Sequence, residues 1–336
     1  MRRRALVPIV IATLGLLLVA CSGPDRTPQI PLASPAPAAS AASAPAASDC
    51  TPAARASYRP LASQPPPRAM PDGTLMSQIQ ERGYLLVGTS SDTRLLSDRN
   101  PLLNPDDPKL YEGFDIEMAR RVAEAIFGDD SPEHLRFRAI SAADRVPFVN
   151  NGVAKGGVDM IARAMTVNCP RWNQVDFSSV YFESTQQVLV RKGAKETTLA
   201  DLGRAKKKVC ATNGSTSIAS LTKFPGIQPV GVKYTTDCMA LWQQGAVDAI
   251  TGDDAILAGL TAQDPSAVVP GRESIEKEPY GLAVAKDHPE FAQFINGVLE
   301  QLRKDGGWQK AYTSSGLAAR LPGRTQPPAD FSRPLP

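Results

Sequence analysis

A segment rich in hydroxyl side chains lies between a strand-like run and a helix-like run. Its sequence is Thr212-Asn213-Gly214-Ser215-Thr216. The first turn of a helix has unpaired main-chain N–H groups and the positive end of the helix dipole, so such a segment can bind an anion. The same residues also make an ordinary helix cap. Thr212 and Ser215 are therefore candidates for contact with a negatively charged group.

Composition argues against two other kinds of chemistry. The 336 residues include only two histidines and no Cys-x-x-Cys pair, which argues against a metal site, and no cofactor is expected. The formal net charge of +3 gives no reason to expect a nucleic-acid partner.

The N-terminus has the pattern of an exported lipoprotein. Three arginines at positions 2–4 precede an apolar run over 5–20, which is short for a membrane span. The run ends in Leu18-Val19-Ala20-Cys21, which looks like a bacterial lipobox. Because the charge, the apolar run and the tetrad stand in the expected order, we expect residues 1–20 to be a signal peptide and Cys21 to be lipidated; the alternative is an ordinary signal peptide with a chance cysteine at the cleavage site. The three arginines account for the whole formal net charge of +3, so the net charge of the rest of the chain is zero.

The next fifty residues have an unusual composition. Residues 22–71 contain 14 Ala, 12 Pro and 7 Ser, with no apolar periodicity. Proline favours extended chain, and such a segment buries too little surface to fold. We therefore expect residues 21–71 to be a lipidated tether.

Four cysteines remain after Cys21, and an even number in an exported chain indicates two disulfides. Three pairings are possible. We predict Cys210–Cys238, which joins the end of a strand-like run to the first turn of a helix-like run, and Cys50–Cys169, which would hold the end of the tether.

The rest of the chain alternates between strand-like and helix-like segments, which is typical of an α/β protein with largely parallel sheets. Ligands of such sheets bind at the carboxyl ends of the strands. The predicted strands are 84–88, 135–140, 158–162, 186–190, 208–211, 230–234, 247–251 and 280–285. The predicted helices are 216–223, 236–244, 254–263 and 289–304, with one helical face at Ile116, Ala119, Val122, Ala123 and Ile126.

Gly113–Ala119 (GFDIEMA) resembles the signature of the extracellular solute-binding proteins, family 3, which serve polar amino-acid ABC importers. Further fragments similar to that family follow in the family's order over nearly all of 72–316. They are Leu85–Gly88, Asp144–Pro147, Val158-Asp159, Arg171, Asp176–Ser178 with Tyr181, Gly214–Thr216, Asp253-Asp254, Leu257–Gly259 and Pro279–Gly281.

The resemblance implies a two-lobed fold of the type II periplasmic-binding-protein class, with the ligand cleft between lobes joined by two crossing strands. Lobe 1 would comprise 72–180 and 281–321, and lobe 2 would comprise 186–275. Residues 181–185 and 276–280 would form the hinge, and 322–336 a flexible tail. Closure would be a hinge motion.

The resemblance also implies roles for site residues. Arg171 follows Thr166 at the family's spacing for the group that binds a ligand carboxylate, and a guanidinium can do so with two parallel bonds. The Thr166 hydroxyl and the backbone near Ala164 would complete this contact, and Asp253 stands at the ammonium-binding position. A solvated arginine and a helix-capping aspartate are the ordinary alternatives.

Two more arginines bear on ligand choice. Arg145 stands where relatives that bind acidic amino acids place an arginine for the ligand side chain, and Arg163 adds a second cation. A neutral amide would leave two buried guanidiniums poorly compensated, so we expect glutamate or aspartate rather than glutamine or asparagine. Either arginine could instead form an ion pair with Asp144 or Asp159.

The resemblance implies a ligand-binding lipoprotein of an ABC importer on the outer face of the bacterial cell membrane. We expect a monomer with an amino-acid ligand, a membrane permease as partner and no enzymatic activity. One alternative is a sensor that reports to a membrane signalling protein. Another is a dehydratase-like enzyme, which would need a placed acid or base; His134 and His288 fall outside the cleft motifs.

Overall fold

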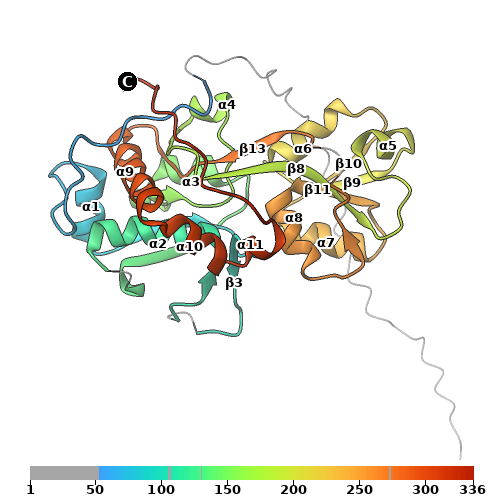
Figure 1. Cartoon of the computed structure of the whole chain (residues 1–336), viewed down its shortest axis with the longest axis horizontal. Helices are drawn as coiled ribbons and strands as arrows, with labels where there is room; N and C mark the ends of the chain where they lie inside the picture. The colour runs from blue at the N-terminus through green and yellow to red at the C-terminus, as the bar shows by residue number, and fades with distance from the viewer. Residues whose placement is uncertain (1–52, 105–106, 130, 272–273) are drawn as a thin grey trace, which may run out of the picture. The chain divides into compact units, whose positions relative to one another are not determined.

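The folded part of the chain is built on two mixed β-sheets with helices packed against them (Figure 1). A computed structural model describes residues 53–104, 107–129, 131–271 and 274–336. The strands are β1 Leu85–Thr89, β2 Asp92–Thr93, β3 Ser97–Arg99, β4 Tyr111–Glu112, β5 Leu135–Ala139, β6 Met160–Ile161, β7 Val175–Phe177, β8 Phe182–Arg191, β9 Lys208–Thr212, β10 Gln228–Val232, β11 Ala249–Asp253, β12 Ala267–Val268, β13 Lys277–Tyr280 and β14 Ala283–Ala285. The α-helices are α1 Leu75–Arg82, α2 Phe114–Phe127, α3 Arg145–Asn151, α4 Cys169–Trp172, α5 Leu199–Arg204, α6 Thr216–Ser220, α7 Thr235–Gln243, α8 Asp254–Thr261, α9 Pro289–Asp305, α10 Gly307–Ser314 and α11 Leu317–Arg320.

The first sheet has the strand order β5-β1-β6-β14-β7, and we call the body around it lobe 1. Strand β1 pairs in parallel with β5 and β6, whereas β14 runs antiparallel to β6 and β7. Helix α2 buries the apolar face predicted from its periodicity, and α9 buries a comparable face. Strands β2, β3 and β4 form a separate small sheet, which shares no strand with the lobe 1 sheet.

The second sheet has the order β10-β9-β11-β8-β12, and we call the body around it lobe 2. Strands β9, β10 and β11 are parallel, as predicted, but β8 runs antiparallel to β11. The expectation of largely parallel sheets is therefore wrong for the strands that enter each lobe from the other one. Such a strand arrives from the opposite end of the sheet and runs in the opposite direction.

Two strands connect the lobes. The first half of β8 pairs antiparallel with β13, from Phe182 opposite Tyr280 to Thr185 opposite Lys277. The remaining residues of β8 join the lobe 2 sheet, and β14 follows β13 into the lobe 1 sheet. Crossing strands thus lie where the sequence places the hinge.

Residues 53–71 pack on lobe 1, contrary to the prediction that they belong to a tether. The buried Tyr58 side chain donates a hydrogen bond to Asp176 at 3.0 Å. The Trp172 indole N–H donates to the Ala54 carbonyl at 2.7 Å, and Met70 is part of the lobe 1 core. Composition concealed these contacts, because a few large side chains suffice to fix an extended, proline-rich segment against a surface.

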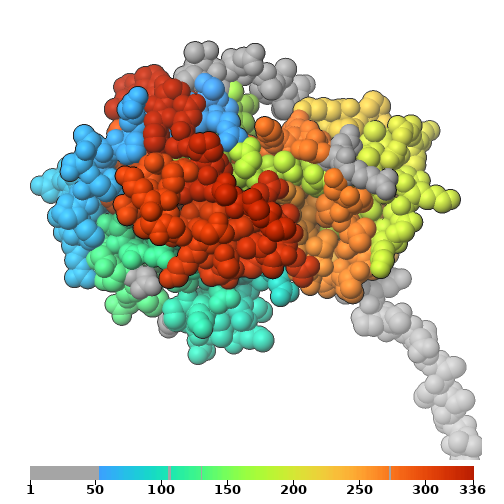
Figure 2. Space-filling view, viewed as in Figure 1, coloured from blue at the N-terminus to red at the C-terminus, as the bar shows by residue number. Residues whose placement is uncertain are grey.

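Residues 322–336 also pack on the body, so the prediction of a flexible tail is wrong. We call these residues the C-terminal strap; in Figure 2 it lies on the visible face together with α10 and α11. The Asp330 carbonyl accepts a hydrogen bond from the Ser57 N–H at 2.8 Å, and the Arg333 guanidinium lies 3.6 Å from the centre of the Trp172 ring. Arg324 donates to the Asp254 carboxylate at 2.5 Å. These contacts hold the strap against the body.

Several predictions concern residues 1–52, which lie outside the described residues. They are the signal peptide at 1–20, the lipidation of Cys21, the tether up to residue 52 and the pairing of Cys50 with Cys169. In the part of the chain that is described, no helix has both the length and the apolar character needed to cross a bilayer.

Candidate functional site

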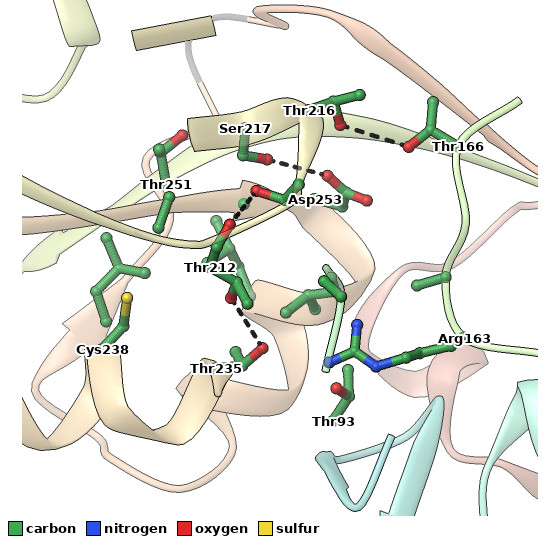
Figure 3. Close-up of a pocket in the computed structure, with 18 of the residues that line it drawn as sticks. Thr93, Arg163, Thr166, Thr212, Thr216, Ser217, Thr235, Cys238, Thr251 and Asp253 are labelled. Atoms are coloured by element: carbon green, nitrogen blue, oxygen red, sulfur yellow. Dashed lines mark hydrogen bonds between the residues drawn. The ribbon is translucent and has the colours of Figure 1, made fainter. Parts of the chain in front are cut away.

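The two lobes enclose a small cavity of about 40 Å³. Hydroxyl side chains, Asp253 and two arginines contribute to its wall, and Figure 3 labels many of them. Lobe 1 contributes Thr93, Ser97, Ala142, Arg145, Arg163, Ala164 and Thr166, and lobe 2 contributes, among others, Thr212, Ser215, Thr216, Ser217, Thr235, Thr251 and Asp253. A space of this size holds a few water molecules, so a larger ligand can be admitted only if the lobes separate.

The lobe 1 wall is the segment that follows β6, from Arg163 to Thr166. Asp115, in the first turn of α2, holds this segment: its carboxylate accepts the Ala164 N–H at 2.8 Å and the Tyr181 hydroxyl at 2.6 Å. Ala164 has a positive φ of 39°, a conformation that costs energy for a residue with a side chain and that surrounding bonds must maintain. Burial raises the pKa of Asp115 to about 6.

Arg145 acts as a brace between chain segments. Its guanidinium donates to the carbonyls of Ala142, Arg163 and Ala164 in lobe 1 and to that of Gly214 in lobe 2, over 2.9–3.3 Å. All three of its nitrogens are therefore engaged with main chain. The sequence expectation that Arg145 contacts a ligand side chain is not supported by this geometry.

Arg163 has a free donor. Its Nε donates to the Ile140 carbonyl at 3.0 Å, and its Nη2 is buried without a hydrogen-bond partner among the described residues. Figure 3 shows the guanidinium pointing into the cavity. Burial lowers the pKa of this guanidinium.

Arg145 and Arg163 do not form the ion pairs with Asp144 or Asp159 that the sequence left as an alternative. The Asp144 carboxylate accepts the Ser141 hydroxyl, at 2.6 Å, and the Asp159 carboxylate pairs with Arg82.

Arg171 lies behind the cavity wall. Its Nη1 donates to the Thr166 carbonyl at 2.7 Å, and its Nη2 makes a longer contact of 3.4 Å with the Gly214 carbonyl of lobe 2. It lines a neighbouring hollow with Arg145, Gln174 and Gly214. Arg171 thus lies beside Thr166 with part of its donor capacity still available, but it does not itself line the cavity, and its contact with a ligand carboxylate stays a prediction.

Asp253 ends β11 and lines the lobe 2 wall. Its carboxylate accepts the Tyr280 hydroxyl at 2.6 Å and the Ser217 hydroxyl at 3.4 Å. Its side chain makes no capping hydrogen bond to α8, so the alternative of a helix-capping aspartate does not apply. Burial, together with the nearby Glu278 charge, raises the pKa of Asp253 well above its usual range.

The hydroxyl residues of lobe 2 have mixed roles. The Ser215 hydroxyl accepts the Ile218 N–H at 3.1 Å, so Ser215 caps α6 as the ordinary interpretation anticipated. The Thr212 hydroxyl lies 3.4 Å from that of Thr235, and both line the cavity.

Sequence reasoning missed Glu278, which lies on crossing strand β13. Its carboxylate accepts hydrogen bonds from the hydroxyls of Thr166 and Thr216, one from each lobe. The proposed donation from the Thr166 hydroxyl to a ligand carboxylate is therefore absent in this arrangement, because the proton is used on Glu278. The one available signal was that Glu278 directly precedes the family-like fragment Pro279–Gly281.

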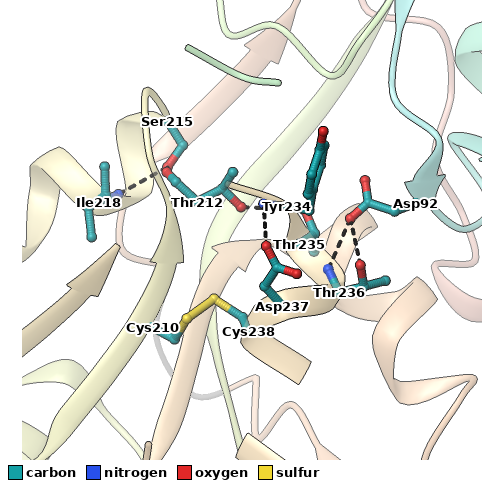
Figure 4. The surroundings of a disulfide bond; sticks show 10 residues. All are labelled: Asp92, Cys210, Thr212, Ser215, Ile218, Tyr234, Thr235, Thr236, Asp237 and Cys238. Carbon is teal, nitrogen blue, oxygen red and sulfur yellow. Dashed lines mark hydrogen bonds between the residues drawn. A yellow bond between two sulfur atoms is a disulfide. The ribbon is translucent and has the colours of Figure 1, made fainter. Parts of the chain in front are cut away.

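A second missed contact closes the cleft on the side of α7. The Asp92 carboxylate, in lobe 1, accepts the N–H of Thr236 at 2.9 Å and its hydroxyl at 3.1 Å (Figure 4). Thr236 lies in the first turn of α7, where a carboxylate is favoured by the helix dipole. The predicted disulfide Cys210–Cys238 is confirmed, and it ties the same helix to β9.

The two histidines contact other parts of lobe 1. His134 stacks on Phe127 and contacts the Gly83 carbonyl, and His288 contacts Glu290 at the start of α9. Within the described ranges, no group of three or more His, Cys, Asp or Glu side chains is placed to hold a metal ion.

Sequence and structure comparisons agree on the family. Residues 96–315 match the profile of the bacterial extracellular solute-binding proteins, family 3. The chain belongs to this family. The match includes both crossing strands and every cavity residue named above except Thr93, and it leaves out residues 53–71 and the C-terminal strap.

Two curated relatives illustrate the similarity. The chain is 33% identical over 238 residues to the ABC transporter glutamine-binding protein GlnH of Bacillus subtilis, covering 70% of this chain and 82% of the relative. It is 31% identical over 244 residues to the glutamate-binding protein GluB of Corynebacterium glutamicum, covering 70% and 79%.

Solved structures of the family share the fold. An ancestral arginine-binding protein bound to glutamine superposes with a TM-score of 0.61 at 28% identity, covering 72% of this chain and 99% of that one. The P235GK mutant of ArgBP from T. maritima gives a TM-score of 0.62 at 28% identity, with the same coverages. This family member therefore has the two-lobed α/β fold of type II periplasmic binding proteins.

Proposed function

We propose that the protein captures an acidic amino acid, glutamate or aspartate, in the cleft between its lobes and delivers it to an ABC importer. It would do so as a lipoprotein held at the outer face of the cell membrane through Cys21. Support for amino-acid capture comes from the family and from the relatives, which are named for glutamine and glutamate binding.

The cavity has complementary groups for a zwitterion. Asp253, buried on the lobe 2 side, is suited to the ligand ammonium. Arg171 lies behind the wall in this arrangement, and with its weakly used Nη2 and the main chain around Ala164 it would bind the α-carboxylate once the lobes have opened to admit a ligand. Because these groups belong to different lobes, a bound amino acid would favour the closed form over the open one.

The preference for an acidic side chain rests on Arg163. A buried guanidinium nitrogen without a partner is costly, and an anionic ligand oxygen would satisfy it with a charge-assisted bond. The amide oxygen of glutamine could accept the same bond but would bring no compensating charge. Arg163, rather than Arg145, is therefore the residue we assign to the ligand side chain.

Calorimetric titration of the full chain in detergent with a panel of amino acids tests this assignment. We expect glutamate or aspartate to bind more tightly than glutamine. We also expect Arg163→Gln to weaken glutamate binding by roughly tenfold or more and glutamine binding by much less. The matched control is Arg136→Gln, which changes an exposed arginine of β5. Tighter binding of glutamine by the unmodified chain would overturn the acidic preference.

A further inference from the structure

Glu278 occupies the junction of the two lobes and the hinge. Its Oε2 accepts the hydroxyl of Thr216, at 2.8 Å, and that of Thr166 in a shorter contact. Both threonines line the cavity, and Figure 3 shows their hydroxyls next to Asp253. Glu278 therefore contacts the cavity wall from behind, through one side chain from each lobe.

The protons of these hydroxyls decide what the threonines can offer a ligand. A hydroxyl has one proton to donate and two lone pairs to accept with. Because both protons point to Glu278, no proton lies between the two hydroxyl oxygens, which are 3.4 Å apart. Thr166 and Thr216 can then present only lone pairs to the cavity, which suits a donor such as an ammonium group and not a carboxylate.

Glu278 is also incompletely satisfied. The residue is 1% exposed, and its Oε1 has no hydrogen-bond partner in the described part of the chain. A buried carboxylate in this condition gains from any nearby positive charge.

The charged groups that face Glu278 have both signs. Arg171 and Arg145 approach from lobe 1, Asp253 from lobe 2, and Glu276 from the chain leading into β13. Burial raises the pKa of Glu278, whereas the two hydroxyl bonds and Arg171 lower it. A cation placed between Glu278 and Asp253 would stabilise the ionised form of both carboxylates.

We propose that Glu278 is a positioning residue for the ligand ammonium group: by accepting the protons of Thr166 and Thr216, it turns both hydroxyls into acceptors beside Asp253. The inference rests on the proposed amino-acid ligand and extends it. The preference of the site for a ligand amino group over a hydroxyl group at the same carbon would then depend on Glu278, which lies on crossing strand β13 and does not itself line the cavity.

The test compares L-glutamate with L-2-hydroxyglutarate, in which a hydroxyl replaces the amino group. Calorimetry on the full chain in detergent gives the affinity ratio of the two for the unmodified protein and for Glu278→Gln. We expect Glu278→Gln to weaken glutamate binding by roughly tenfold and to change 2-hydroxyglutarate binding much less, so that the ratio falls by roughly tenfold. If glutamine is the ligand that binds, glutamine and its 2-hydroxy analogue make the same comparison.

The matched control is Glu112→Gln, which changes an exposed glutamate of β4; it should leave the ratio unchanged. Should Glu278→Gln fail to fold, Thr216→Val removes one of the two acceptors and should lower the ratio in the same direction. A purely structural role would weaken both ligands equally, and an unchanged ratio in a folded variant overturns the inference. Failure of every amino acid in the panel to bind would instead overturn the proposed function.

Discussion

The carboxylate of Asp115 accepts the main-chain N–H of Ala164 at 2.8 Å, across 49 positions of sequence. Asp115 belongs to the fragment that most resembles the family signature, and Ala164 lies in the cavity wall. The signature carboxylate thus supports the wall from the core side. It is completely buried, and its second oxygen accepts the Tyr181 hydroxyl.

Asp115 should make the stability of the protein depend on pH. Its pKa is raised by burial from the ordinary value of 3.8 to about 6, so the folded state holds the proton more tightly than the unfolded state. The stability contributed by this proton is present below pH 4 and is lost as the pH rises to about 6. We expect the free energy of unfolding of the unmodified chain, relative to Asp115→Asn, to fall by roughly 3 kcal/mol over this range.

Urea unfolding of both proteins between pH 4 and pH 7 measures this difference. The matched control is Asp72→Asn, which changes an exposed aspartate near α1. A difference between unmodified and Asp115→Asn proteins that stays constant with pH would contradict the prediction.

Asp92 should contribute to ligand affinity without contacting the ligand. Its two bonds to Thr236 join lobe 1 to lobe 2 and exist only when the lobes are together. Asp92→Ala should therefore favour the open form and weaken ligand binding by roughly tenfold. Calorimetry measures the affinity, and small-angle X-ray scattering of the ligand-free protein measures the opening.

The control for Asp92 is Asp98→Ala, in the neighbouring strand β3 of the same small sheet. If the Asp92 variant opened no further than the control and bound with full affinity, the Thr236 contact would have no role in closure.

Local patterns in the sequence predicted much of the fold. Strands such as β9 and β11 were found because they contain short apolar runs, and the buried face of α2 was found because its apolar residues repeat with the period of a helix. The disulfide Cys210–Cys238 was found because each cysteine lies at the end of such an element. These are properties of segments that can be recognised without knowing what packs against them.

Contacts between distant segments were not predictable in this way. Glutamate in a strand is usually solvent-exposed, and Glu278 becomes buried only because β13 pairs with β8 while both lobes close over it. Asp92 and Thr236 are 144 residues apart, and neither has a neighbour in sequence that indicates the other. The contacts of residues 53–71 and of the C-terminal strap depend likewise on a surface that only the folded body provides.

Loss of the disulfide should destabilise lobe 2. Cys210–Cys238 closes a loop with a sequence separation of 28, and it links β9 to α7. Chain-entropy arguments give roughly 3.5 kcal/mol for a loop of this length. Cys210→Ala combined with Cys238→Ala should unfold at correspondingly lower urea concentration. A reducing agent should lower the stability of the unmodified chain more than that of the double variant, which keeps the predicted Cys50–Cys169 pair, and equal sensitivity of the two would argue against the prediction.

The C-terminal strap should stabilise the junction of the lobes. Arg324 donates to the Asp254 carboxylate at 2.5 Å and to the Glu183 carbonyl at 3.3 Å, near the start of both α8 and β8. Arg324→Ala should lower the free energy of unfolding by about 1–2 kcal/mol, because the partner is a largely buried carboxylate. The control is Arg320→Ala, an exposed arginine of α11. Equal stability of the two variants in urea would show that the Arg324 contact is neutral.

The pairing of the strap with residues 53–57 also bears on protein engineering. Ala56 and Asp330 form a β-bridge, so the two ends of the described chain already run side by side on lobe 1. A short linker could join them, and new termini could then be opened in a surface turn of lobe 2, such as the one at Gly193. A circularly permuted chain of this kind would carry a fluorescent reporter on one lobe while the other is immobilised, and the hinge motion itself would become the signal.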